Sequence, residues 1–557
     1  MQSLNPDLSE QSTSSTNAPI ILSSHNTGTQ AVTRKMFFLS VWVSFAAWIA
    51  EFDIGYAGIV LIMPSYQKAF GHCRSVHDPD TGNAIEACEL STLQQSLISL
   101  TLLFMAVGSV LAGLVGSKLG RRRTIQMACI FCLVGAAGML GTTGSFVSYM
   151  VCKCINGVGI GQLLASAIVY GAECVAADKR GLLLGIFNIG LAMGNVTAAA
   201  VCAGSATLAP DNDWQWKTPI ICQIPLSVIL AVGMYLFPES PRWLLLKKKE
   251  EEARTSFATL LGLNALSTEV AVQVEDIQRH LEFERSLSKT TSWIEIYHGA
   301  NLRRTAVSGL ILVALAITGI QFVAPFAALF LSGVGVENPY VVNVIVGLCI
   351  FGGACIGSIP LEYGGRRFSM LVGYSLMAIC MLIFSSVATG LGADNPIAKH
   401  VVVAFVCIWA FVFGGFIGPS VWLASAEMHC LQLRTYGQAN TTFCYEIFAF
   451  GATFWTPYML NPEYGNMGTN VGYFYFGITV AVLVLVFLFV PETSRLTLEQ
   501  IDDYFASGKP AWKTSTSENL KISREVALNT TSSPRGQSEV EKQVPCTRTH
   551  NSEIEVR

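Results

Sequence analysis

Charged residues are scarce in this sequence: Lys, Arg, Asp and Glu make up 13% of its 557 residues, whereas a soluble domain carries about 25%. Hydrophobic residues make up 52%, and the mean hydropathy is +0.48. This balance excludes an ordinary soluble protein and indicates a polytopic protein whose partner is the lipid bilayer. The net charge is only -3 and there is no basic tail, so nucleic acid is not an expected partner.

The sequence also lacks the side-chain patterns of an enzyme. It contains no paired nucleophile and base, no metal-ligand cluster and no phosphate-binding loop. Cys129/Cys132 and Cys152/Cys154 have spacings seen in metal sites, but they lie in apolar runs, where cysteine is a small hydrophobe. We therefore expect no enzymatic activity, no cofactor and no metal site.

Long apolar runs are abundant, and twelve of them are close to the roughly 20 residues that cross a bilayer. A lone span in lipid must satisfy its backbone groups internally, so each run is predicted to be a helix. The predicted spans are 36–60, 94–116, 124–144, 147–172, 183–207, 217–237, 307–331, 339–360, 368–391, 400–426, 437–460 and 470–490.

Charged motifs mark the ends of these runs, and three of them occur twice in the same order. The repeated pairs are Pro-Glu-Ser/Thr at 238–240 and 491–493, Gly-Arg-Arg at 120–122 and 365–367, and a Glu and an Arg that enclose six residues at 173–180 and 427–434. Such a repeat indicates a duplicated membrane domain. The expected fold class is an all-α polytopic membrane protein with twelve transmembrane helices in two pseudo-symmetric six-helix halves.

Basic residues gather in the short loops on one side of the predicted spans. These loops hold Lys118, Arg121, Arg122, Arg123, Lys179, Arg180, Arg366, Arg367 and Arg434. The positive-inside rule then places both termini in the cytoplasm. The polar loop with Cys73 and Cys88 is expected to be extracellular or luminal, where the two residues either form a disulfide or remain free thiols.

Five regions follow from this pattern. They are a disordered cytoplasmic tail at 1–35, a six-helix half at 36–237, a cytoplasmic linker with amphipathic helices at 238–304, a second six-helix half at 305–490, and a cytoplasmic tail at 491–557. Within the linker, residues 270–283 have helical periodicity with a polar face. The linker is either a solvated spacer or part of a gate. Residues 506–557 are polar and are predicted to be disordered.

The repeated Glu and Arg residues lie at the cytoplasmic ends of helices, where they either fix the topology or form a latch. We expect ion pairs across the two halves, because a transporter must hold one state and then release it. Partial burial makes such a pair worth more than an ion pair on the surface. The candidate gate residues are Arg121, Arg122, Glu173, Arg180, Glu239, Arg242, Glu362, Arg366, Glu427, Arg434, Glu492 and Arg495.

In combination, these motifs resemble the sugar porter family of the major facilitator superfamily over roughly residues 36–505. The resemblance is carried by the three repeated motifs, by Gly418-Pro419, and by Trp422 before Glu427. The run at 455–458 is most similar to the fungal branch, with its α-glucoside, lactose and hexose permeases. The resemblance implies alternating access by rocking of the two halves and a central substrate site.

Asp53 lies inside the first predicted span, where an ionisable group is costly and usually functional. The resemblance places Asp53 at the acidic position of proton-coupled members. It places Lys153 at the partner position, where most relatives have Arg. A carboxylate there can bind a proton on one side of the membrane and release it on the other. The alternative is a static ion pair.

The resemblance also assigns substrate contacts, and here the sequence departs from the family. The family's glutamines of span 5 fall on Asn188 and Asn195, and its paired glutamines of span 7 fall on Leu315 and Ala316, which cannot bond a hydroxyl group. The candidate substrate-binding residues are Asn188, Asn195, Gln321, Trp422, Tyr445 and Glu446. Fewer amides that bond hydroxyl groups indicate a substrate other than plain glucose.

Glu446 is the sharpest departure, because Tyr445-Glu446 replaces an Asn-Trp pair of the family in the middle of span 11. No basic residue lies at helical spacing within that span. Three interpretations stay open: a second protonatable site, a partner for a cationic or amine-bearing substrate, or a neutral acid hydrogen-bonded inside the bundle.

These observations predict a secondary transporter, monomeric and in the plasma membrane, that imports a sugar or sugar-like polyhydroxy compound together with protons. Two alternatives remain. One is a facilitator or exporter of a non-sugar metabolite, and the other is a non-transporting nutrient sensor.

Overall fold

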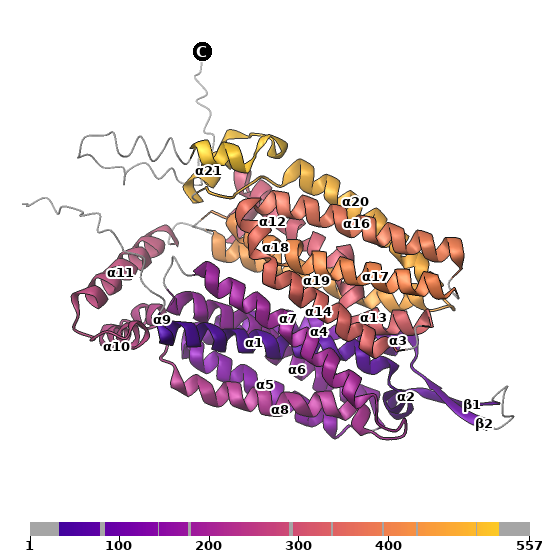
Figure 1. The fold of residues 1–557 in the computed structure, drawn as a ribbon. Helices are drawn as coiled ribbons and strands as arrows, with labels where there is room; N and C mark the ends of the chain where they lie inside the picture. The colour runs from indigo at the N-terminus through magenta and orange to yellow at the C-terminus, as the bar shows by residue number, and fades with distance from the viewer. Residues whose placement is uncertain are drawn as a thin grey trace, which may run out of the picture.

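The computed structural model of the chain describes residues 33–77, 84–142, 144–175, 180–288, 293–335, 338–392, 395–430, 433–496 and 498–522. Two bundles of long helices lie side by side (Figure 1), one from each half of the chain. Short helices of the linker and the C-terminal segment lie at one end, which we call the motif end. A two-stranded hairpin extends from the opposite end, which we call the hairpin end.

The N-terminal half begins with a helix that Thr33 caps through its side chain. Its elements are α1 (Arg34–Ile59), η1 (Val60–Ile62), α2 (Pro64–Phe70), β1 (His72–His77), β2 (Ala84–Glu89), α3 (Thr92–Leu97), α4 (Leu100–Leu119), α5 (Arg121–Leu140), α6 (Phe146–Cys174), α7 (Arg180–Ser205), α8 (Trp214–Gly233) and η3 (Met234–Leu236). The linker then forms α9 (Pro241–Leu246), α10 (Glu250–Leu261), α11 (Thr268–Ser288) and η4 (Trp293–Tyr297).

The C-terminal half repeats the arrangement, and two of its helices begin with an Asn cap followed by Pro at the first helical position. Its elements are α12 (Gly299–Leu315), η5 (Ala316–Ile320), α13 (Gln321–Gly333), α14 (Pro339–Ile356), α15 (Ser358–Tyr363), α16 (Arg366–Leu391), α17 (Pro396–Val412), η6 (Phe413–Ile417), α18 (Gly418–Glu427), α19 (Arg434–Leu460), η7 (Gly468–Asn470), α20 (Val471–Phe489), α21 (Leu498–Ser507) and η8 (Ala511–Lys513).

Among the described residues, eleven helical segments are long and apolar enough to cross a membrane. The predicted eleventh span corresponds to α19, a helix of 27 residues that is not among those eleven. This helix is less apolar because it carries Thr441, Glu446 and other polar residues. With α19 the fold has the expected twelve transmembrane helices in two halves.

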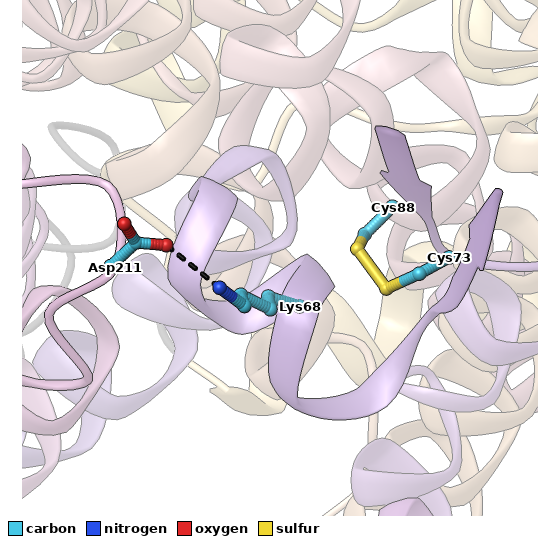
Figure 2. Close-up of a disulfide and its surroundings, with 4 residues drawn as sticks. All are labelled: Lys68, Cys73, Cys88 and Asp211. Atoms are coloured by element: carbon cyan, nitrogen blue, oxygen red, sulfur yellow. Dashed lines mark hydrogen bonds and ion pairs between the residues drawn. A yellow bond between two sulfur atoms is a disulfide. The ribbon is translucent and has the colours of Figure 1, made fainter. Parts of the chain in front are cut away.

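The hairpin is a small addition to the expected all-α fold. Strands β1 and β2 are antiparallel and place Cys73 directly opposite Cys88, and the structure joins the two residues in a disulfide (Figure 2). Beside the hairpin, Lys68 of α2 pairs with Asp211 of the α7–α8 connection at 2.8 Å. Both features lie at the hairpin end.

The two halves touch at the hairpin end. Tyr340 donates a hydrogen bond to the backbone oxygen of Ile62 at 3.2 Å. Asn461 donates to the hydroxyl of Thr92 at 2.7 Å. Gly58 of α1 packs so closely on α13 that an added Cβ would lie 1.5 Å from the backbone oxygen of Pro325. The two halves are therefore in direct contact at this end.

The prediction that residues 506–557 are disordered is wrong for the part that the structure describes. Residues 508–522, which we call the C-terminal strap, return to the end of α20. Asn519 donates hydrogen bonds to the backbone oxygens of Glu492 and Ser494, both at 3.0 Å. Thr516 donates to the backbone oxygen of Gly364 at 2.8 Å. Polar side chains order this segment by bonding to backbone groups of the repeated motif, a use that composition does not reveal. Residues 523–557 lie outside the described residues.

Candidate functional site

A charged pair is buried where α1, α6 and α8 meet. Lys153 donates a hydrogen bond to Oδ1 of Asp53 at 2.7 Å, and the two side chains are 2% and 1% exposed. Asn156 and Gln223 donate to the same oxygen at 3.1 and 2.8 Å. The other carboxylate oxygen, Oδ2, is also buried and has no hydrogen-bond partner among the described residues. Oδ1 thus accepts all the described hydrogen bonds of this carboxylate.

Tyr56 completes the surroundings of Lys153. The ammonium group donates to the Tyr56 hydroxyl at 3.0 Å and lies 4.4 Å from the centre of its ring. An aromatic face of this kind stabilises a cation that has lost its water. The sequence predicted neither Tyr56 nor Asn156 and Gln223 as members of this site. Tyr56 and Asn156 lie one helical turn from Asp53 and Lys153, which was an available signal. Gln223 comes from a separate helix, so the sequence held no such signal for it.

Three of the predicted substrate residues lie together in the C-terminal half. Gln321 donates to the Tyr445 hydroxyl at 3.3 Å, and the Tyr445 ring packs edge-on against Trp422 with ring centres 5.3 Å apart. Thr453, which was not predicted, donates to the amide oxygen of Gln321 at 3.1 Å. Leu315 is 3% exposed and faces no open surface.

Two helix interruptions position these residues. The segment η5 (Ala316–Ile320) has π-helical turns, and Gly319 within it has φ 110°. It directly precedes Gln321. The segment η6 (Phe413–Ile417) is also π-helical, and it precedes the helix that carries Trp422. Interruptions of this type are frequent at functional sites, because they turn side chains away from the regular helix face.

The two asparagines of α7 face the opposite half. The carboxamide oxygen of Asn188 lies 3.9 Å from the position that a Cβ would take on Gly418 of α18. The carboxamide oxygen of Asn195 lies 3.1 Å from the corresponding position on Gly347 of α14. Both side chains therefore lie at the boundary between the halves, across from the C-terminal group.

Glu446 is 9% exposed, and its Oε2 is buried without a hydrogen-bond partner among the described residues. No basic residue forms a described ion pair with it. It follows Tyr445 directly, and so it belongs to the same part of the C-terminal half as the other substrate residues.

The repeated motifs form two clusters with the same internal geometry. In the first motif cluster (Arg121, Glu173, Glu239 and Ser240), Arg121 binds Glu173 through two hydrogen bonds of 3.1 and 3.0 Å. Ser240 donates to Glu173 at 2.6 Å. Glu239 accepts the backbone N–H groups of Arg121 and Arg122 at 2.8 and 3.1 Å. This is a carboxylate at a helix N-terminus, where the unpaired N–H groups attract negative charge.

The second motif cluster (Arg366, Glu427, Glu492 and Thr493) repeats each contact. Arg366 binds Glu427 at 3.2 and 2.8 Å, and Thr493 donates to Glu427 at 2.6 Å. Glu492 accepts the backbone N–H groups of Arg366 and Arg367 at 3.0 and 3.1 Å. Ser240 and Thr493 were not predicted as partners, although both belong to the repeated motif.

The expectation that these charges pair across the two halves is wrong for both clusters. Each arginine reaches a glutamate of its own half, because the planar guanidinium group and the carboxylate meet in a two-bond arrangement next to the helix end. Each cluster therefore braces one half.

The remaining gate candidates differ in exposure and in their described contacts. Arg122 donates to the backbone oxygen of Phe237 at 3.2 Å. Glu362 and Arg495 are exposed. Arg242 is half-buried on α9, Arg434 is half-buried at the start of α19, and the side chain of Arg180 lies outside the described residues.

Comparison with known proteins gives a consistent result. A family model described as "Sugar (and other) transporter" matches residues 39–505. A high-affinity fructose transporter of Schizosaccharomyces pombe is 26% identical over 479 residues, which cover 85% of this chain and 88% of that protein. A hexose transporter of Saccharomyces cerevisiae is 26% identical over 488 residues, which cover 86% and 84% of the two chains.

Solved structures share the fold. The partially occluded inward-open xylose transporter XylE from E. coli aligns with a TM-score of 0.67 and 18% identity, over 84% of this chain and 100% of that one. XylE as a proton:xylose symporter bound to 6-bromo-6-deoxy-D-glucose aligns with a TM-score of 0.66 and 19% identity, over 85% and 100% of the two chains.

Proposed function

Because this chain belongs to the sugar (and other) transporter family, a family of multi-pass membrane transporters and not of enzymes, we propose that it imports a sugar or sugar-like polyhydroxy compound together with a proton. The observation that carries the proposal is the buried pair of Asp53 and Lys153. The sugars named for its relatives support the substrate class.

Asp53 is the proton site in this mechanism. In the charged state, Oδ1 accepts three hydrogen bonds and Oδ2 accepts none from the described residues. A proton that binds Oδ2 neutralises the carboxylate and weakens its attraction to Lys153. The ammonium group keeps its contacts with the hydroxyl and ring of Tyr56. The pair can therefore loosen without leaving the lysine unsolvated, which a proton-driven change of state requires.

The two motif clusters keep each half rigid during that change. Each ties the helices of its own half together, so rocking occurs at the boundary between the halves. Asn188 and Asn195 lie at that boundary, and Gln321, Trp422 and Tyr445 form a group in the C-terminal half. The three amides and the Tyr445 hydroxyl can bond a polyhydroxy substrate, and the Trp422 ring can stack on its apolar face. Opening of the hairpin end must break the contacts of Tyr340 and Asn461 with the other half.

We place the motif end and both termini in the cytoplasm, with the protein acting as a monomer in the plasma membrane. The basic loops gather at the motif end, as the positive-inside rule requires of a cytoplasmic face. The disulfide lies at the other end, and disulfides persist in oxidising compartments.

The proposal is tested by uptake in cells that lack their own sugar carriers. A panel of labelled sugars is supplied with and without a proton uncoupler, to wild type, Asp53→Asn and the control Asp211→Asn. Asp211 is an exposed carboxylate at the hairpin end, so the control makes the same chemical change outside the buried pair.

We expect uptake that the uncoupler abolishes, that Asp53→Asn removes and that Asp211→Asn retains. Uptake that is insensitive to the uncoupler would make the protein a facilitator, with a static pair at Asp53. No uptake of any sugar by well-expressed protein would favour an exporter of another metabolite or a nutrient sensor.

A further inference from the structure

The ammonium group of Lys153 uses all three of its N–H groups on one turn of helix α1. It donates to Oδ1 of Asp53 at 2.7 Å, to the backbone oxygen of Asp53 at 3.3 Å and to the hydroxyl of Tyr56 at 3.0 Å. A lysine side chain has three donors and no acceptor, so its bonding capacity is filled. Two of its three acceptors do not belong to the carboxylate.

The hydroxyl of Tyr56 is oriented to accept the hydrogen bond from Lys153. It donates its own hydrogen to the sulfur of Met139 on α5, at a distance of 3.9 Å, and its lone pairs therefore remain for the ammonium group. Tyr56 is 0% exposed, and the centre of its ring lies 4.4 Å from Nζ of Lys153. Both the hydroxyl and the ring stabilise a cation that has lost its water, whether Asp53 is ionised or neutral.

The carboxylate of Asp53 is bonded on one side only, unlike the glutamates of the two motif clusters. In each motif cluster, the arginine binds both oxygens of its glutamate. At Asp53, the ammonium group and the amides of Asn156 and Gln223 all bond to Oδ1, and Oδ2 has no hydrogen-bond partner among the described residues. A proton that binds Oδ2 therefore displaces no described donor, and its main cost is the lost attraction between Asp53 and the ammonium group.

The other titratable groups around this pair, among the described residues, carry no charge near neutral pH. Tyr149 of α6, Cys132 of α5 and Tyr66 of α2 interact with it electrostatically, and ordinary phenols and thiols ionise only above neutral pH. Helix α8 faces the pair with the amide of Gln223, and α13 has no ionisable side chain. Glu51 of α1 faces α7 instead. No neighbouring charge in the described part of the chain thus replaces the carboxylate once it is neutral.

We propose that Tyr56 is a positioning residue for proton coupling, which holds the ammonium group of Lys153 in place while Asp53 is neutral. This inference rests on the proposed function and adds a residue to the same site. A proton from water binds Oδ2, Lys153 keeps its three hydrogens, and the pair gains one positive charge. The ammonium group can then move closer to Tyr56, so the tyrosine stabilises the state with neutral Asp53 more than it stabilises the ion pair.

The test measures uptake of labelled glucose, fructose and xylose over a range of external pH by wild type, Tyr56→Phe, Tyr56→Leu and the control Tyr235→Phe. Tyr56→Phe removes the hydroxyl and keeps the ring, whereas Tyr56→Leu removes both. Tyr235 is 70% exposed in η3, so the control removes a hydroxyl outside the bundle. A second measurement is the exchange of labelled sugar between equal concentrations on the two sides, which needs no net movement of protons.

We expect Tyr56→Phe to need an about tenfold higher proton concentration for half-maximal uptake, a shift of about one pH unit, as the loss of one hydrogen bond to a charged group implies. Tyr56→Leu should shift the profile further toward low pH, because it also loses the ring. Exchange by Tyr56→Phe should stay near the wild-type rate, and Tyr235→Phe should follow wild type in both measurements. Preserved exchange separates a role in coupling from a role in folding.

A Tyr56→Phe profile that is unchanged or shifted toward high pH, with wild-type uptake still driven by protons, would overturn this inference and leave the proposed function intact. Loss of both uptake and exchange in Tyr56→Phe would also overturn it, because the hydroxyl would then serve the fold and not the coupling. Wild type that carries none of the three sugars, or that carries them independently of pH, would overturn both this inference and the proposed function.

Discussion

Gly120 and Gly365 hold the backbone of the two motif clusters in a conformation that other residues resist. Their φ angles are 99° and 93°, with ψ at 164° and 175°. This region is essentially restricted to glycine. An added Cβ at either position would also lie within 2.4 or 2.5 Å of the carboxylate of Glu239 or Glu492. The glycines thus let each glutamate reach the helix N-terminus.

Gly120→Ala should therefore lower the free energy of unfolding by about 1 to 3 kcal/mol, the usual cost of a non-glycine residue in this region. The measurement is thermal melting of the purified protein in detergent. Gly113→Ala is the matched control, because Gly113 lies in α4 and has no atom within 4 Å of an added Cβ. In a helix that change is neutral or stabilising. Equal melting temperatures for Gly120→Ala and Gly113→Ala would contradict this prediction.

His429 is the buried residue outside the spans whose protonation should affect stability. It is 3% exposed. Burial, with a smaller contribution from the charges of Arg304 and Arg434, lowers the pKa of His429 from 6.5 to about 4. Gly437 leaves room for the ring, since a Cβ there would lie 2.2 Å from its Nδ1.

The folded chain therefore binds fewer protons at His429 than the unfolded chain does between these two pKa values. The stability contributed by the neutral ring is complete above pH 6.5 and is lost as the pH falls toward 4, by about 3 kcal/mol in total. As the pH is lowered from 7 to 5, the melting temperature of wild type should fall more steeply than that of His429→Gln. The exposed His400 provides the control, and His400→Gln should follow wild type. Parallel curves for wild type and His429→Gln would refute the prediction.

At the scale of an element, one side chain, that of Asn519, does most to hold the C-terminal strap in place. The amide of Asn519 is 3% exposed and bonds two backbone oxygens of the second motif, while Thr514 accepts the backbone N–H of Glu492 at 2.8 Å. The strap thus fixes the backbone on which Glu492 sits.

Asn519→Ala should release the strap, because it leaves two buried carbonyl groups without a donor, at about 1 to 3 kcal/mol. Faster hydrogen–deuterium exchange over residues 508–522, together with faster tryptic cleavage at Lys513, is the expected result. Ser517→Ala changes an exposed hydroxyl of the same strap and should leave both rates near those of wild type. A strap that stays protected in Asn519→Ala would mean that the threonine contacts suffice.

Much of this element structure could be predicted from the sequence. The lengths of the apolar runs predicted the helices, and the repeated motifs predicted the two halves. The resemblance to the sugar porter family predicted that Asp53 pairs with Lys153. What escaped prediction depends on contacts between distant segments: Gln223 reaches Asp53 from α8, Thr453 reaches Gln321 from α19, and the strap finds its acceptors on backbone atoms. The sequence also did not predict that each arginine pairs with a glutamate of its own half, because residue spacing does not determine which glutamate a guanidinium group contacts.

At the scale of the whole molecule, the contact of Gly58 with Pro325 decides how closely the halves approach at the hairpin end. A side chain at position 58 would collide with the backbone of α13. Closure of this end is therefore possible only with glycine there, because backbone atoms cannot rotate away as a side chain can.

Gly58→Val should hold the hairpin end open and reduce uptake severely, while the separately braced halves remain folded. The measurement is disulfide formation between cysteines introduced as Thr92→Cys and Asn461→Cys, whose native side chains lie 2.7 Å apart, with peptide mapping to separate them from the native cysteines. We expect efficient cross-linking with Gly58 and poor cross-linking with Val. Gly113→Val controls for the bulk of the new side chain, and equal cross-linking in all three backgrounds would count against the prediction.

The self-contained motif clusters also have a consequence for the history of such a protein. When a gene for six helices is copied and fused to itself, each copy brings a complete brace that needs nothing from the other. Mutations at the facing surfaces, such as those of the asparagines of α7, then leave the stiffness of both copies intact. A lineage built in this way can change what it carries without first having to rebuild how it moves.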